Sequence, residues 1–196
     1  MSLPSPPLPV KPLVSLIFAQ PALETTVFRC LADFLGPPDM VSGWLSFQQT
    51  HYYEPEMGPD LQRRLAVFLH LADPVELCHW KGWTNALESR LSLGGRRVVN
   101  IDPGYISRER LVLATGKNYT HRLYLGQGLY GDLSLIYQKS AWQPLAWTYP
   151  DYASPEFLEF FSQARKKYLW QLRCLGEIKK PGNAARRKPP VSHIPD

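Results

Sequence analysis

The chain has 196 residues, 44% of them hydrophobic and 20% charged, which suits one globular domain with a full core. Its three cysteines, Cys30, Cys78 and Cys174, have no CxxC spacing, which argues against a disulfide framework or a zinc knuckle. Of the net charge of +5, residues 177–196 contribute +3, from five basic and two acidic residues. The nearly neutral remainder argues against a nucleic-acid-binding face, so nucleic acid is expected as a partner only through this tail.

The two ends of the chain differ in composition from the middle. Residues 1–12 hold five prolines and predict an extended arm, whereas residues 177–196 lack periodicity and predict a basic disordered tail. The apolar run at 13–19 is too short to cross a membrane and has no basic region before it. We therefore expect a cytoplasmic protein without a membrane partner, with a single domain at residues 13–176.

The elements are predicted from hydrophobic spacing and from capping and turn residues. In chain order they are a buried strand at 13–19, a helix at 21–35, a strand at 40–47, a polar-aromatic loop at 50–58, and helices at 59–71 and 73–91. Strands at 97–101 and 111–115, a hairpin at 119–137 and a long helix from Pro155 follow. This order predicts an α+β domain, with an antiparallel or mixed sheet of about six strands and helices packed mainly on one side.

The hairpin is the element whose pairing can be predicted in detail. A three-residue loop at 126–128 places Leu125 opposite Leu129, Leu123 opposite Gly131, and Arg122 opposite Asp132. One face is then mainly apolar and the other polar, and a slip of one residue would scramble both.

No nucleotide-binding motif is present. Thr115-Gly116-Lys117 would need a glycine at position 111 to complete a P-loop, and that position is Leu111. No GxGxxG follows a strand, and no HExxH or paired Cys/His spacing occurs, so no metal site is assigned and the cofactor stays unknown. A divalent cation held by carboxylates is compatible with the sequence.

Polar residues at predicted strand ends and turns are the candidates for a site. Asn100 and Asp102 share one side of a strand, before a turn at Pro103-Gly104. Arg97 and Lys117 are candidates to hold an anion, and Asp102 or Glu56 to act as a general base or to hold a cation. The alternative for Asp102 is an Asx turn in which it caps its own backbone.

Other candidates have structural alternatives of their own. Lys81 and Asn85 belong, with Glu88, to a polar stripe on a helix, which could also be a solvated face. His121, a third candidate catalytic group, and Arg122 fall on opposite faces of the hairpin. The alternatives are a hydrogen-bonded core histidine and an ion pair of Arg122 with Asp132. The aromatic residues at 147–152 could form a stacking platform or simple packing.

Six segments together resemble a family of bacterial and archaeal proteins classed as a domain of unknown function. They are 52–58 (YYEPEMG), 81–88 (KGWTNALE), 95–105 (GRRVVNIDPGY), 111–122 (LVLATGKNYTHR), 125–130 (LGQGLY) and 147–152 (WTYPDY). The resemblance covers roughly residues 13–174 and implies no assigned activity. Some members of the family carry the label GTP-binding protein, but this chain lacks the P-loop and any NKxD-like guanine motif. The motif-rich segments coincide with the polar candidates above.

Two functions follow from these patterns. The first is a small-molecule site for an anionic or phosphorylated ligand, which could be enzymatic. The alternative is a non-catalytic interaction module that binds RNA or an acidic partner through its basic tail.

Overall fold

The structure is a computed structural model that describes residues 3–48 and 53–178. Nearly all of the predicted tail, and residues 49–52 of the predicted polar-aromatic loop, lie outside these residues. The strands are β1 (Lys11–Phe18), β2 (Pro38–Val41), β3 (Leu45–Ser46), β4 (Gln62–Phe68), β5 (Val99–Ile106), β6 (Arg110–Thr115), β7 (Arg122–Gly126), β8 (Leu129–Gln138) and β9 (Ala141–Pro144). The helices are α1 (Glu24–Leu35), α2 (Glu54–Met57), α3 (Leu77–Leu91) and α4 (Pro155–Cys174), with 3-10 turns η1 (Pro21–Leu23), η2 (Pro74–Glu76) and η3 (Pro150–Ala153).

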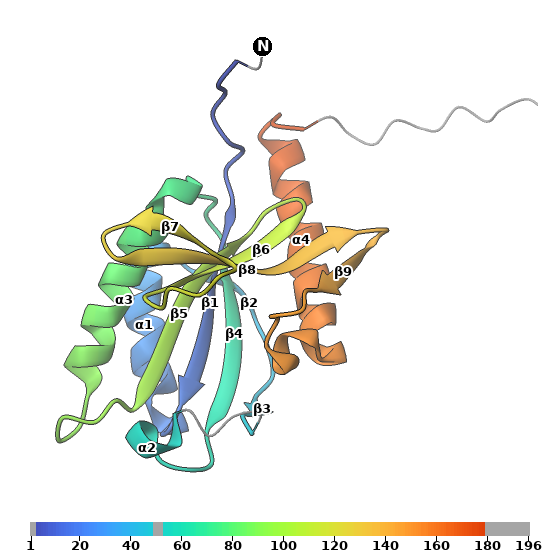
Figure 1. The fold of residues 1–196 in the computed structure, drawn as a ribbon. Helices are drawn as coiled ribbons and strands as arrows, with labels where there is room; N and C mark the ends of the chain where they lie inside the picture. The colour runs from blue at the N-terminus through green and yellow to red at the C-terminus, as the bar shows by residue number, and fades with distance from the viewer. Residues whose placement is uncertain (1–2, 49–52, 179–196) are drawn as a thin grey trace, which may run out of the picture.

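The described residues form one nine-stranded antiparallel sheet in the order β2-β4-β1-β5-β6-β8-β7 (Figure 1). The short strands β3 and β9 pair with β4 and β8. The α+β class and the antiparallel sheet are confirmed, and the sheet is larger than the six strands predicted. None of the helices in the described ranges is both long and apolar enough to span a bilayer.

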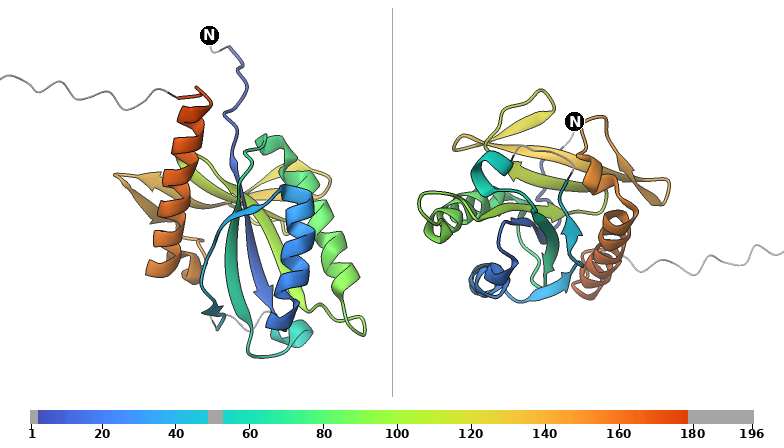
Figure 2. Two further views of the ribbon diagram at one scale, coloured as in Figure 1. Left: turned by 180° about the vertical axis from the view of Figure 1, so that it is seen from behind. Right: turned by 90° about the horizontal axis from the view of Figure 1, so that it is seen from below.

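Helices cover both faces of the sheet, as Figure 2 shows. α1 and α3 pack on the face that carries Val14, Leu16 and Phe18 of β1. α4 packs on the other face, against Leu13 and its neighbours. All eight residues of β1 are buried because the strand is central and covered on both sides, which explains its continuous apolar sequence. The sheet begins inside the segment predicted as an arm, since β1 starts at Lys11 and the Val10 N–H donates to the Ala72 carbonyl over 2.8 Å.

The predicted helix at 59–71 is wrong, because residues 62–68 form strand β4. Leu61, Leu65 and Phe68 have helical spacing, but short apolar runs fit either structure. Here β4 pairs with β1 along one edge and with β2 and β3 along the other, so nonlocal pairing decides the outcome. Residues 54–57, inside the predicted loop, form the short helix α2.

The predicted turn at Pro103-Gly104 is also wrong, because β5 runs straight through it. β5 pairs with β1 along its whole length, from Val99 opposite Phe18 to Ile106 opposite Lys11. It pairs with β6 only at residues 104–106. Before Gly104 the two strands separate, and β6, β8 and β7 turn away from the direction of β1 and β4 (Figures 1 and 2). The sheet is therefore split along the first half of β5.

The β7–β8 hairpin has the predicted register over most of its length. Arg122 faces Asp132, Leu123 faces Gly131 and Tyr124 faces Tyr130. The register shifts only beside the loop, where Gly126 and not Leu125 pairs with Leu129.

Gly104 sits where β5 and β6 first meet, and only a glycine fits there. A Cβ at this position would lie 2.3 Å from the Val112 carbonyl oxygen, so Gly104→Ala forces two backbones apart. We expect a loss of about 1–3 kcal/mol in the free energy of unfolding, measured by urea denaturation. Gly82→Ala is the matched control, because a Cβ there meets nothing within 4 Å and α3 gains up to about 1 kcal/mol from helix propensity. Equal stability of the two variants would contradict the close approach.

Candidate functional site

A pocket of about 280 Å³ occupies the split between β5 and β6. One wall comes from the main sheet and α3, and the other from β6 and β8. The loop before α4 adds aromatic side chains. The residues that carry its chemistry are Tyr53, Arg63, Lys81, Asn85, Arg97, Asn100, Asp102, Lys117, Arg122, Asp132, Ser134, Trp147, Tyr149 and Tyr152.

Within the described residues, the split leaves the backbone of Ile101 without a neighbouring strand on one side. Two side chains of α3 take the place of that strand. The Ile101 N–H donates to Glu88 Oε1 over 2.6 Å, and Lys81 Nζ donates to the Ile101 carbonyl over 3.1 Å. In a strand, the N–H and the carbonyl of one residue point to the same edge, and the residue two positions further on points its N–H and carbonyl to that edge as well. Pro103 therefore turns its missing N–H toward the same open edge, where no partner strand needs it.

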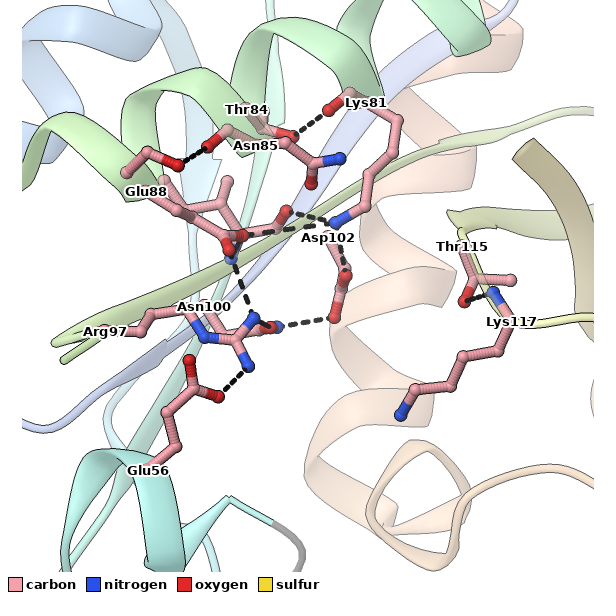
Figure 3. Close-up of polar contacts among 12 residues, drawn as sticks. Glu56, Lys81, Thr84, Asn85, Glu88, Arg97, Asn100, Asp102, Thr115 and Lys117 are labelled. Carbon is pink, nitrogen blue, oxygen red and sulfur yellow. Dashed lines mark hydrogen bonds and ion pairs between the residues drawn. The ribbon is translucent and has the colours of Figure 1, made fainter. Parts of the chain in front are cut away.

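The same lysine orients the carboxylate of Asp102. Lys81 Nζ lies 2.9 Å from Asp102 Oδ1, and the Asn100 amide donates to Asp102 Oδ2 over 2.6 Å (Figure 3). Burial alone would raise the pKa of Asp102, but the charge and hydrogen bond of Lys81, with the bond from Asn100, hold it below its ordinary value. Asp102 is thus an ionised, fixed carboxylate on the pocket wall. It makes no Asx turn, because it lies inside β5.

Arg97 links this wall to the short helix α2. Its Nη1 lies 3.1 Å from Glu88 Oε2 and donates to Asn100 Oδ1 over 2.8 Å, and its Nη2 lies 2.5 Å from Glu56 Oε2. Burial raises the pKa of Glu88, while the charges of Lys81 and Arg97 oppose that rise. Glu56 is thereby drawn into the network from α2, but it supports Arg97 and does not line the pocket.

The opposite wall is built around Asp132 of β8. The Arg122 Nε donates to Asp132 Oδ2 over 2.8 Å, and His121 Nε2 lies 3.3 Å from the same oxygen. The predicted Arg122–Asp132 pair is confirmed. The prediction that His121 and Arg122 point to opposite faces is wrong, because β7 begins at Arg122 and His121 lies in the turn before it. Lys117 extends from the turn after β6 toward the Asp102–Arg97 network (Figure 3).

Trp147 and Tyr149 form an exposed aromatic rim on this pocket. The Trp147 Nε1 donates to the Leu133 carbonyl over 2.8 Å, and its ring stacks on His121 with a centroid distance of 5.0 Å. Trp147 remains 40% exposed and Tyr149 43% exposed, so both rings offer surface to a bound molecule. Deeper in the pocket, burial raises the pKa of Tyr53 and of Tyr152, so both stay protonated phenols.

Seven of the nine predicted site residues line this one pocket: Lys81, Asn85, Arg97, Asn100, Asp102, Lys117 and Arg122. Glu56 and His121 contact lining residues from outside. The roles of all nine residues in binding or catalysis stay predictions. The alternative that Lys81 and Glu88 belong to a solvated face is wrong, because they are only 6% and 7% exposed. Asn85, on the same stripe, is exposed and extends into the site.

Arg63 is the cationic lining residue that sequence reasoning missed, and Tyr53, Asp132 and Ser134 were not predicted as site residues either. Arg63 lies on β4, in the segment predicted as a helix, and is buried at the pocket. Its spacing of two and four residues from Leu65 and Val67, which places all three on one face of a strand, was the available signal. The described residues contain no group of three or more His, Cys, Asp or Glu side chains arranged to hold a metal ion.

Fold and site together define a small α+β domain whose split antiparallel sheet encloses a charged pocket with an aromatic rim. The chain belongs to the family described as Domain of unknown function (DUF4416), whose model matches residues 8–168. No curated protein and no solved structure matches the chain. The matched residues include the whole of the pocket lining.

Lys81 contacts three acceptors in this site, the Ile101 carbonyl, Asp102 and Glu88. Lys81→Met leaves the Ile101 carbonyl, Asp102 and Glu88 without their shared cation, so we expect a loss of about 3–5 kcal/mol in the free energy of unfolding. Urea denaturation checks this. Lys166→Met, at an exposed position of α4, is the control and should change stability by less than about 0.5 kcal/mol. Similar values for both variants would show that Lys81 has no such role.

Proposed function

We propose that the pocket binds a small anionic molecule, with phosphorylated compounds as the leading class. The observation that carries this proposal is the gathering of five cationic side chains from five separate segments. They are Arg63 of β4, Lys81 of α3, Arg97 before β5, Lys117 after β6 and Arg122 of β7. Among the described residues, two carboxylates line the pocket, those of Asp102 and Asp132. The other acids paired with these cations, Glu56, Glu88 and Asp151, lie outside the lining.

This arrangement favours binding to an anion for two reasons. Guanidinium groups recognise phosphate through paired, charge-assisted hydrogen bonds, and the acids behind them fix their orientation before a ligand arrives. The pocket volume of about 280 Å³ is close to the lower end of small-molecule sites. The aromatic rim of Trp147 and Tyr149 offers a flat surface beside the charged wall for the rest of the molecule.

Asp102 suits the role of a binding group better than that of a general base. A base works best with a pKa near the working pH, and the Lys81 charge lowers the pKa of Asp102. An ionised carboxylate at this position would accept hydrogen bonds from ligand hydroxyls, or would hold a divalent cation that arrives with a phosphate. A reaction at this site would therefore depend on positioning by charge more than on proton transfer by Asp102.

A thermal-shift screen tests the proposal with inorganic phosphate, pyrophosphate, sugar phosphates, nucleoside monophosphates and dicarboxylates, each with and without Mg²⁺. A ligand at about 100 times its dissociation constant adds about 2.7 kcal/mol, which for this size of chain raises Tm by roughly 5–11 °C. Lys117→Gln should reduce the shift, because it removes a charge from the pocket wall. Lys166→Gln, at an exposed position of α4 outside the pocket lining, should leave the shift unchanged.

A flat screen would count against the pocket as an anion site. Salt-sensitive binding to RNA that disappears when residues 177–196 are deleted would then support the interaction-module alternative. A shift of the same size in the wild type, in Lys117→Gln and in Arg63→Met would indicate nonspecific charge attraction outside the pocket and would also contradict the proposal.

A further inference from the structure

Arg63 is held rigidly at the buried end of the pocket. Its guanidinium carbon lies 4.5 Å from the Phe47 ring centroid and 5.1 Å from that of Tyr152. Contacts with two aromatic rings fix the guanidinium plane and leave its edges as the groups that can bind. The side chain is therefore organised before any ligand enters, which lowers the entropy lost on binding.

The protein satisfies this guanidinium poorly. Nη1 forms an ion pair of 2.6 Å with Asp151 Oδ2. Within the described residues, however, Nε and Nη1 of Arg63 and Oδ2 of Asp151 have no partner with hydrogen-bond geometry. Buried polar groups are nearly always hydrogen-bonded, and an unsatisfied charged group costs more than a neutral one. Burial raises the pKa of Asp151 in spite of the neighbouring arginine, so the carboxylate is not well stabilised either.

We propose that Arg63 binds the ligand's phosphate group. The phosphate replaces Asp151 as the main partner of the guanidinium. This inference rests on the proposed function and assigns the anion to Arg63, which is buried, and not to Lys117, which is half-buried. The phosphate oxygens bind the guanidinium from the pocket side and reach Nη1 once Asp151 is displaced, because Nη1 is buried beside Asp151 in this structure. The remainder of the ligand then extends past Asp102 toward the rim formed by Trp147 and Tyr149.

The assignment makes two substitutions act in opposite directions. Arg63→Met removes the guanidinium and should weaken phosphate binding at least tenfold, as expected for a lost charge-assisted pair. Arg63→Lys keeps the positive charge but loses the paired N–H donors of the guanidinium, so its phosphate affinity should fall between those of Arg63→Met and the wild type. Asp151→Asn removes the competing negative charge and should strengthen binding several-fold. Its Oδ1 can still accept the hydrogen bond from the Tyr152 N–H, which is 3.0 Å long.

Isothermal titration calorimetry with inorganic phosphate measures all four proteins, after urea denaturation has shown that each is folded. Weaker binding in Arg63→Met together with stronger binding in Asp151→Asn supports the assignment. Equal weakening in both variants would assign them a merely structural role and overturn it. Undiminished binding in Arg63→Met would overturn the assignment but leave the proposed function standing, whereas a wild type that binds no phosphorylated compound would remove both. Should Arg63→Met fail to fold, the sign of the Asp151→Asn change decides.

Discussion

The site depends on how the backbone of Ile101 is satisfied at the open edge of β5. A continuous sheet would have paired β6 along β5 and left no space between them. Separating the strands exposes an N–H and a carbonyl, and each would cost about 1–3 kcal/mol if left buried without a partner. Glu88 and Lys81 of α3 satisfy both groups and hold the split open. Gly104 and Pro103 mark its end, where close contact with β6 begins.

The contacts of Lys81 and Glu88 with β5 also set the electrostatics of the pocket. Replacing a buried ion pair by apolar residues is often neutral or even stabilising, so Lys81 and Glu88 are poorly explained by stability alone. Their remaining atoms reach Asp102 and Arg97, and Arg97 reaches Glu56. A chain of alternating charges thus runs from α3 across β5 to α2. The wall it forms faces Lys117, Arg122 and the aromatic rim.

Local patterns predicted the elements that local interactions form. The helix predicted at 73–91 forms as η2 and α3, where the Asp73 side chain accepts from the Val75 N–H, and most of the β7–β8 register follows from its loop and alternation. β4 was assigned wrongly because Leu61, Leu65 and Phe68 fit a helical period, while its pairing with β1 and β2 lies far away in sequence. Arg63 was lost with it. Lys81 and Glu88 resembled a solvated face because their partners on β5 are 13 to 21 residues away, beyond the reach of any periodicity.

Hydrogen exchange at the Ile101 amide, followed by NMR, measures whether Glu88 protects the open edge of β5. We expect this amide to exchange as slowly as the amides of β1 in the wild type, although none of the described strands pairs with it on that side. Glu88→Ala should accelerate exchange at Ile101 far more than in β1, because it removes the acceptor of the Ile101 N–H. Fast exchange at Ile101 in the wild type, or unchanged protection in Glu88→Ala, would contradict the role given to α3.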